Sequence, residues 1–491
     1  MRRRPTIIFY SILRKECAMN NKYKRLLSDT ALFGISNFAS KVISFLLIPL
    51  YTSKLTTADY GVSDLIQTTV NFLYPFLTLS ISEATIRFAF EKKNNVLSTS
   101  LLFIFVSTII LLLASPLVSK INLELSQFWG YFIVYYFCFN IHYCLSQYTR
   151  GCDKTRLFAI QGIIQTCTVI LSNIVFLVFL NTGIKGYLLS FIIGYIIAIF
   201  LMLIKGNYWG EILCLNIDKP LIKEMLRYSI PMIPTQIFWW INNAADKWII
   251  IANVGMEENG IYSVAHKIPT ILTMLTSIFN QAFQLSAFSN YKEKDNSDFF
   301  SKVYHVFWLL NVFTCTILIS GSELLGRILF ANDFYRGWTF VPVLLVASVF
   351  NGLSGMLASA FTSAKKNNVL FISTGIGAVC NIILNLIFID IFGSMGAAYA
   401  TAISCMLVWG IRIIQTQKCV CIKVNYFKHI IAILALVGQV YLTSNHIFNI
   451  WIVGVVTVLF LFLIYAKEIF HVSNLVYKKI RLMIKYRRGN K

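Results

Sequence analysis

The chain has 491 residues, of which 57% are hydrophobic and only 13% carry a charged side chain. Its 43 Lys and Arg residues against 21 Asp and Glu residues give a formal net charge of +22 at pH 7. This composition excludes an ordinary soluble protein, and the distribution of apolar residues leaves no room for a soluble catalytic domain.

Apolar segments follow one another along almost the whole chain. A helix needs about 20 residues to cross the hydrocarbon core of a bilayer, and about fourteen segments meet that length. The sequence therefore predicts an all-α, polytopic membrane protein. The predicted spans are 28–51, 64–89, 97–119, 128–149, 157–180, 184–204, 228–252, 259–288, 299–321, 338–362, 369–391, 394–416, 427–444 and 449–468.

Basic residues concentrate in every second loop between these spans. Lys and Arg gather in short cytoplasmic loops, and with the N-terminus inside they fall at 2–25, 92–93, 150–156, 205–227, 292–294, 365–366, 418–428 and 478–491. The opposite loops carry only Lys54, Lys120, Lys185, Arg327 and Arg336. An even number of spans with both termini cytoplasmic is expected. The positive charge is explained by this orientation and by attraction to membrane lipids with anionic headgroups. No nucleic-acid partner is expected.

Polar landmarks recur in the same order in two halves of the chain. Thr57–Ser63 after the first span matches Glu257–Ser263 after the seventh. Leu171–Phe176 in the fifth span matches Ile383–Phe388 in the eleventh. The longest polar interruption, 205–227, separates the halves. Two repeated halves of six helices are typical of transporters that bind substrate between them.

The repeat divides the chain into six predicted parts. No bound metal or other cofactor is expected. The cysteines are scattered, and Cys419-Val-Cys421 lacks the second pair that a zinc site needs. The predicted parts are a basic cytoplasmic N-terminus at 1–27, a six-helix bundle at 28–204, a cytoplasmic linker at 205–227, a second six-helix bundle at 228–416, two additional helices at 427–468 and a basic cytoplasmic tail at 469–491.

Three short stretches of the sequence resemble one membrane-protein family. Cys380–Thr401, the Tyr60-Gly61 turn and Gly260–Ala265 are similar to sequences in polysaccharide-unit flippases, the O-antigen and exopolysaccharide transporters often called Wzx. They belong to the superfamily of multidrug, oligosaccharidyl-lipid and polysaccharide exporters. The resemblance covers Lys22–Arg412. It implies two six-helix bundles around a V-shaped cavity, with two extra C-terminal helices.

The resemblance also implies an activity. Such a protein moves undecaprenyl-pyrophosphate-linked oligosaccharide units across the bacterial cytoplasmic membrane by alternating access, for the synthesis of O-antigen, capsule or exopolysaccharide. It is a transporter and not an enzyme. A polysaccharide polymerase and a chain-length regulator are its expected partners. The repeat unit and any coupling to H⁺ or Na⁺ stay open.

Ionisable residues within spans are the first candidates for the site, because hydrocarbon tolerates them poorly. Lys41 lies in the middle of the first span, where it would be the countercharge to a diphosphate. A lysine paired with a carboxylate is the alternative. Asp246 could neutralise Lys247 or Lys267 in such an ion-pair set. The full set of candidate cavity cations is Lys41, Lys247, His266, Lys267 and Arg87.

Two carboxylates are candidates for coupling to an ion gradient, Glu83 and Asp246. Glu83 lies four residues before Arg87 on the same helical face, which also suits an internal ion pair. Arg412, at the cytoplasmic end of its span, is expected to anchor the helix at the interface.

Amides and aromatic rings in the spans are the candidates for sugar contacts. Amides inside a bundle also join helices to one another, which is the alternative interpretation. The candidates are Gln236, Trp239, Trp240, Asn242, Asn243, Asn280, Gln281, Gln284 and Asn385.

Prolines interrupt corresponding spans of the two halves. Pro75 falls in the second span and Pro269 in the eighth. Since proline removes a backbone hydrogen bond and kinks a helix, these are candidate gating positions. A static kink that improves packing is the alternative.

Two other functions compete with a flippase. A multidrug or cation antiporter of the same superfamily would have the same fold with an acidic cation site. A membrane polysaccharide polymerase would need a catalytic loop, and the longest outward loop, about 322–337, carries no carboxylate pair placed for glycosyl chemistry. No phosphate-binding Gly-x-x-x-x-Gly-Lys-Ser/Thr motif is present.

If a cationic cavity binds the diphosphate, Lys41→Ala will abolish polysaccharide export, because the anion loses its countercharge. The protein will still insert into the membrane, as judged by immunoblotting of membrane fractions. Normal surface polysaccharide in this variant would remove Lys41 from the mechanism.

Overall fold

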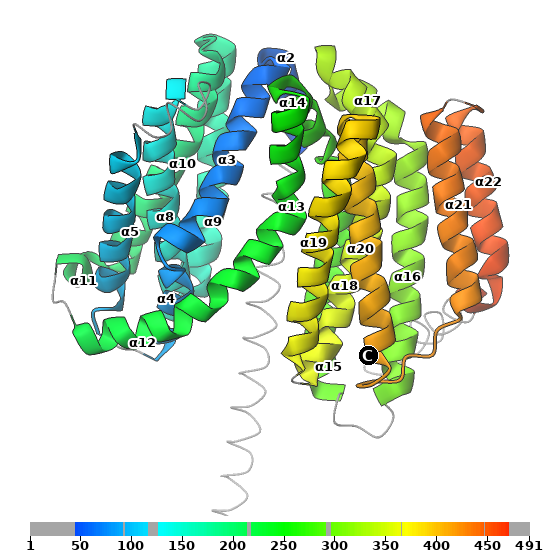
Figure 1. Ribbon diagram of the computed structural model, residues 1–491. Coiled ribbons are helices and arrows are strands. Elements are labelled where there is room, and N and C mark those ends of the chain that lie inside the picture. Colours follow the sequence, from blue (N-terminus) through cyan, green and yellow to red (C-terminus); the bar gives the residue numbers. More distant parts are fainter. Residues whose placement is uncertain are drawn as a thin grey trace, which may run out of the picture. The chain divides into compact units, whose positions relative to one another are not determined.

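The computed structural model describes residues 45–91, 94–115, 126–213, 218–290, 296–364, 366–445 and 447–470. Over these residues every regular element is a helix (Figure 1). The contacts divide the chain into two compact units. The first is built on Ile66–Ile237 and the second on Ile48–Leu65 together with the chain from Phe238 onward.

The first unit packs its helices around an apolar core. The core draws buried side chains from several helices, with Leu97, Tyr148, Met202 and Met225 among them. The elements are most of α3 (Thr57–Leu77), then α4 (Ile81–Phe90), α5 (Val96–Leu113), α8 (Trp129–Gly151), α9 (Thr155–Asn173), η1 (Ile174–Phe179), α10 (Gly183–Gly206), α11 (Trp209–Leu213), α12 (Lys219–Ser229) and η2 (Ile230–Met232).

Helix α12 is an amphipathic helix in the predicted linker. The Asp218 carboxylate caps it by accepting a 3.2 Å hydrogen bond from the Leu221 backbone N–H. Leu221 and Met225, one turn apart, are buried in the core of the first unit, and the helix packs on α4. The linker is therefore structured where it leads into the seventh predicted span.

The second unit is centred on α20, which packs against both α18 and α19 (Figure 1). Helix α15 also packs on α18. The elements are α2 (Ile48–Lys54), the start of α3, most of α13 (Ile233–Asn253), α14 (Met256–Ala265), α15 (Pro269–Asn290), α16 (Asn296–Ser320), α17 (Ser322–Leu329), η3 (Asn332–Phe340), α18 (Val341–Ser363), α19 (Asn367–Phe392), α20 (Ser394–Thr416), α21 (Tyr426–Ser444) and α22 (Ile450–Ile464).

The last two helices, α21 and α22, join the second unit through α16. The Trp308 indole on α16 donates a 3.0 Å hydrogen bond to the Tyr465 hydroxyl just after α22. Gln439 on α21 donates at 3.0 Å to the backbone carbonyl of Thr316. Buried polar contacts of this kind hold helices together where the surroundings are as apolar as the side chains.

The outer surfaces of many helices are apolar, as a bilayer requires. Helix α19 exposes Ile376, Val379, Ile383 and Leu386, and α22 exposes a similar row. Among the described residues, eight helices are long and apolar enough to span a membrane. The predicted total of about fourteen spans stays a prediction, and most of the first predicted span lies outside the described residues.

Two predicted spans are each broken into two helices. The second span, 64–89, is interrupted at Thr78–Ser80, three residues after Pro75, where Leu79 and Ser80 both adopt φ of 52°. The eighth, 259–288, is interrupted by a turn before Pro269, which becomes the first residue of α15. Proline suits a helix start because its missing N–H has no partner there anyway. Whether these breaks act as gates stays a prediction.

The start of α3 crosses α14 with backbone against backbone. A Cβ on Gly61 would lie 2.3 Å from the Met256 carbonyl oxygen, and one on Gly260 would lie 2.0 Å from the Thr57 carbonyl oxygen. The contact is reciprocal, since each glycine faces the carbonyl four residues before the other glycine. Asn259 adds a 3.2 Å hydrogen bond to the Gly61 carbonyl. The two repeated sequence motifs therefore pack on each other.

We expect Gly260→Ala to destabilise the protein by about 1–3 kcal/mol, because the added methyl group meets backbone that has no room to move. Gly410→Ala is the matched control, since a Cβ there meets nothing within 4 Å. Thermal unfolding in detergent will show a lower midpoint for Gly260→Ala only. Equal midpoints for both variants would contradict the close crossing.

Candidate functional site

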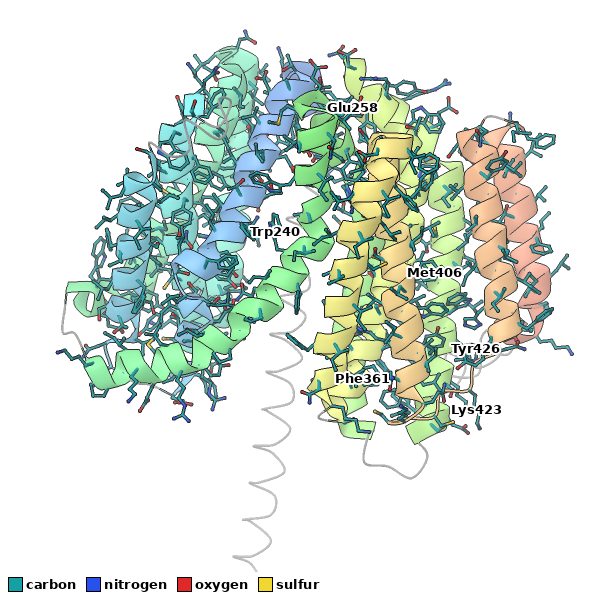
Figure 2. All side chains as sticks on the ribbon, in the orientation of Figure 1. Trp240, Glu258, Phe361, Met406, Lys423 and Tyr426 are labelled. Carbon is teal, nitrogen blue, oxygen red and sulfur yellow. The ribbon has the colours of Figure 1, made fainter. Side chains whose placement is uncertain are left out.

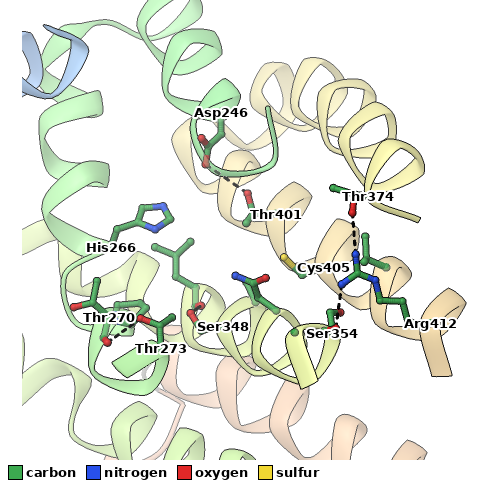
Figure 3. Close-up of a pocket in the computed structure, with 16 residues that line it drawn as sticks. Asp246, His266, Thr270, Thr273, Ser348, Ser354, Thr374, Thr401, Cys405 and Arg412 are labelled. Atoms are coloured by element: carbon green, nitrogen blue, oxygen red, sulfur yellow. Dashed lines mark hydrogen bonds between the residues drawn. The ribbon is translucent and has the colours of Figure 1, made fainter. Parts of the chain in front are cut away.

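The second unit contains a polar cavity of about 390 Å³ (Figure 3). We call it the polar cavity. Its walls come from α13, α15, α18, α19, α20 and the turn before α15, through Asp246, His266, Pro269, Thr270, Thr273, Leu344, Ala347, Ser348, Asn351, Ser354, Gly355, Thr374, Thr401, Cys405, Val408 and Arg412.

One face of α20 runs the length of the polar cavity. Thr401, Cys405, Val408 and Arg412 recur at steps of four, three and four residues, which places them on the same helical face. At 1.5 Å per residue, Thr401 and Arg412 lie roughly 16 Å apart along the axis. An acidic and a basic side chain therefore line the same cavity near opposite ends of this face.

Asp246 of α13 forms the acidic end and is 3% exposed. Its carboxylate accepts a 2.7 Å hydrogen bond from the Tyr262 hydroxyl and a 3.5 Å one from Thr401 (Figure 3). The His266 ring lies against the Tyr262 ring, with centroids 4.7 Å apart. Among the described residues, His266 Nε2 is buried without a hydrogen-bond partner. This end combines a charged acceptor with a free imidazole nitrogen.

Arg412 forms the basic end, which corrects its expected role as an interfacial anchor. The residue is only 9% exposed. Its guanidinium donates to Ser373 Oγ at 3.0 Å, the Ser354 carbonyl at 3.0 Å and Thr374 Oγ1 at 2.8 Å. The ion pairs of the described residues do not include it. Neighbouring hydroxyls and a carbonyl hold this cation inside the unit instead of at the lipid headgroups.

Lys247 is neutralised, and its partner is Asp64 of α3. The Lys247 ammonium lies 2.8 and 3.0 Å from the two Asp64 carboxylate oxygens, with the side chains 13% and 16% exposed. Asp246, the partner considered from the sequence, instead accepts from the Lys247 backbone N–H at 2.9 Å. Lys267 joins no ion pair among the described residues, and the Asp64 carboxylate is its electrostatic neighbour.

A chain of polar side chains leads from Asp246 into α19. Thr401 accepts a 3.4 Å hydrogen bond from Asn381, and Asn381 in turn accepts from Asn385 at its backbone carbonyl and its side-chain oxygen. Asn385 is fully buried. The predicted sugar-contact residue thus lies inside the helix packing, and its role with a sugar stays a prediction.

In the first unit, Glu83 and Arg87 do not pair with each other. Glu83 accepts a 2.6 Å hydrogen bond from Tyr143, whose hydroxyl also accepts from Gln147 at 2.9 Å. Arg87 instead forms a 2.9 Å ion pair with Glu91, four residues later. Glu91 lies at the helix end where both side chains reach the surface, so the pair forms there.

The other sugar-contact candidates are dispersed. Gln236 accepts a hydrogen bond from the Tyr74 hydroxyl in the first unit. Asn280 donates to the Gly352 carbonyl at 3.5 Å, beside the polar cavity. Trp240 is half-buried on α13 (Figure 2). The side chains of Trp239, Asn242, Asn243, Gln281 and Gln284, and the whole of Lys41, lie outside the described part of the structure.

Sequence reasoning missed Asp64 and misread Arg412. Asp64 stands at the edge of a predicted span, where a carboxylate needs no explanation, and only the crossing at Gly61 brings it to Lys247. For Arg412, a signal was available. It lies on one helical face with Thr401 and Cys405, so a polar stripe could have been read along the span.

A comparison with protein families identifies the family of this chain. Residues 26–288 match the family model described as polysaccharide biosynthesis protein. The chain belongs to this family. It is also 24% identical over 426 residues to the uncharacterized membrane protein MJ1375 of Methanocaldococcus jannaschii, a match that covers 80% of this chain and 99% of that protein. With eight described helices that are long and apolar enough to span a membrane, this chain is a multi-pass membrane protein.

Solved structures with the same fold are transporters. The lipid II flippase MurJ in its inward closed conformation superposes with a TM-score of 0.71 and 14% identity, covering 89% of this chain and 100% of that one. An inward-facing multidrug resistance transporter of the MATE family gives a TM-score of 0.63 and 13% identity, covering 79% and 94%. The predicted all-α membrane-protein fold is confirmed, and the chain shares it with these two transporters.

The ion pair of Asp64 and Lys247 gives a stability prediction. Lys247→Met alone will destabilise the protein by about 3–5 kcal/mol, because it leaves a largely buried carboxylate unpaired. Adding Asp64→Asn will recover most of that loss.

Thermal unfolding in detergent tests this, with Lys423→Met as the control. Lys423 pairs with Asp298 at 2.8 Å, but the two side chains are 71% and 59% exposed, and a solvated pair contributes little. A Lys247→Met variant as stable as Lys423→Met would refute the role of the buried pair.

Proposed function

We propose that this protein is a flippase that moves lipid-linked oligosaccharide repeat units from the cytoplasmic to the outer leaflet of a bacterial cytoplasmic membrane. The observation that carries the proposal is membership of the polysaccharide biosynthesis family in a chain with a transporter fold. The substrate would be an undecaprenyl-pyrophosphate-linked oligosaccharide, destined for O-antigen, capsule or exopolysaccharide.

The physical problem in such transport is to carry a diphosphate and sugars past hydrocarbon. Both groups need hydrogen bonds and countercharge along the way, since charged groups in lipid are costly. The polar cavity offers hydroxyls, an amide and a cation inside the second unit. The prenyl tail would stay in lipid while the two halves expose the head group to one side and then the other.

The position in the cell is part of the proposal. Both termini would be cytoplasmic, as the distribution of Lys and Arg predicts. A polymerase and a chain-length regulator would act on the translocated units. A gradient of H⁺ or Na⁺ could drive the step through Asp246 or Glu83.

A multidrug exporter is the second candidate. The likeness of the fold to a MATE-family transporter favours it, as does Asp246, a buried carboxylate of the kind that a cation-coupled exporter needs. Such a protein would act on amphipathic cations, and its loss would leave surface polysaccharide unchanged.

Deletion of the gene in its host will remove surface polysaccharide, and complete single repeat units will accumulate on the cytoplasmic leaflet. Extraction of lipid-linked intermediates, with and without a membrane-impermeant oxidant of sugars, locates them. Repeat units that reach the outer leaflet but stay unpolymerised would point to a polymerase. Unchanged polymer with increased sensitivity to drugs would point to the exporter.

A further inference from the structure

We propose that Arg412, with Ser354 and Asn351, forms a phosphate-binding site at the basic end of the polar cavity. On the proposed function, on which this inference rests, the ligand is the diphosphate of the lipid carrier. The charge of Arg412, its unused hydrogen-bond donors and its position along α20 all favour such a ligand.

The charge of Arg412 needs a partner that the described residues do not supply. A guanidinium stays ionised in proteins, and an uncompensated buried charge is strongly unfavourable. Two other candidate cations are already neutralised, Lys247 by Asp64 and Arg87 by Glu91. Arg412 has only neutral oxygens around it. Among these three cations it is the one with charge left for an anionic ligand.

Arg412 also has donors to spare. A guanidinium carries five N–H groups, and its three hydrogen bonds leave one N–H on each terminal nitrogen. Two N–H groups in one plane match two oxygens of a phosphate and bind them in bidentate fashion. The existing bonds to Ser373, Thr374 and the Ser354 carbonyl fix the plane, so the site needs little rearrangement to bind.

Two α18 side chains complete the proposed site. Ser354 Oγ is buried and has no hydrogen-bond partner among the described residues. The backbone carbonyl of the same residue, Ser354, accepts the hydrogen bond from Arg412 (Figure 3). Asn351, one turn earlier, lines the same cavity and is exposed although it lies in the middle of the helix. A hydroxyl and an amide can both donate to phosphate oxygens.

The position of the site suits loading of a lipid-linked anion. Arg412 lies one turn before the end of α20, which the predicted topology puts on the cytoplasmic side. Thr401, which donates a hydrogen bond to Asp246 of α13, lies roughly 16 Å farther along the same face of α20. An anion would be attracted to the basic end and repelled by the acidic one, so the polar cavity would bind it at Arg412.

The test measures binding to the purified full-length protein in detergent. The probes are geranylgeranyl diphosphate, geranylgeraniol and inorganic pyrophosphate. We expect the wild type to bind the prenyl diphosphate and not the alcohol. Arg412→Gln should weaken that binding about 10- to 100-fold, the range for a charge-assisted hydrogen bond. Arg412→Lys should give an intermediate loss, because it keeps the charge but not the bidentate geometry.

Ser354→Ala keeps the test decisive if Arg412→Gln does not fold. The Ser354 hydroxyl makes no internal hydrogen bond that the change would break, and we expect a loss of about 3- to 10-fold. Thr362→Ala, on the same helix, and Arg336→Gln, at an exposed ion pair with Glu258, are the controls and should bind as the wild type does.

Unchanged binding in folded Ser354→Ala and Arg412→Gln would overturn the site. Binding of inorganic pyrophosphate in preference to the prenyl diphosphate would overturn the lipid as ligand. The outcome is separable from that of the flippase proposal. If deletion blocks translocation but these variants bind and translocate normally, the flippase proposal stands and the site falls. If deletion leaves the polymer unchanged while binding still depends on Arg412, the site stands and the flippase proposal falls.

Discussion

The ion pair between Asp64 and Lys247 is the contact on which the organisation of the second unit depends. An unpaired charge at either position would be strongly unfavourable inside a membrane protein. The pair forms because α3 and α14 cross closely, with glycines at the two points where side chains would collide. By occupying Lys247, Asp64 leaves the Asp246 carboxylate to Tyr262 and Thr401.

The same requirement explains the polar cavity. The carboxylate of Asp246 and the guanidinium of Arg412 are kept in place by neutral hydrogen-bonding groups and do not neutralise each other. Separated buried charges are tolerated only where polar groups or a ligand solvate them. A transporter gains from this arrangement, since a cavity that satisfied its own charges fully would have nothing left to bind a substrate.

Much of the fold could be predicted from the sequence, because the length of the apolar segments is a direct consequence of the bilayer. The repeat could also be recognised in the sequence. Its glycines, Gly61 and Gly260, are needed because each faces backbone of the other motif. The side chains that contact one another across helices were harder to predict. Glu83 and Arg87 have the spacing of an ion pair, yet Tyr143 and Glu91 take their places. Helical spacing gives the face of a residue but not what packs against it.

The boundaries between the two units fall inside helices α3 and α13, which limits how the gene can be divided. The sequence repeat suggests a cut in the polar segment 205–227, whereas the contacts assign Ile48–Leu65 to the second unit. A C-terminal fragment made by that cut would lack the carboxylate for Lys247 and the helix that covers Gly260. The two halves of the coding sequence are thus not two folding modules. A split version would therefore need both fragments in one membrane, so that the first could return to the second the segment that belongs to its packing.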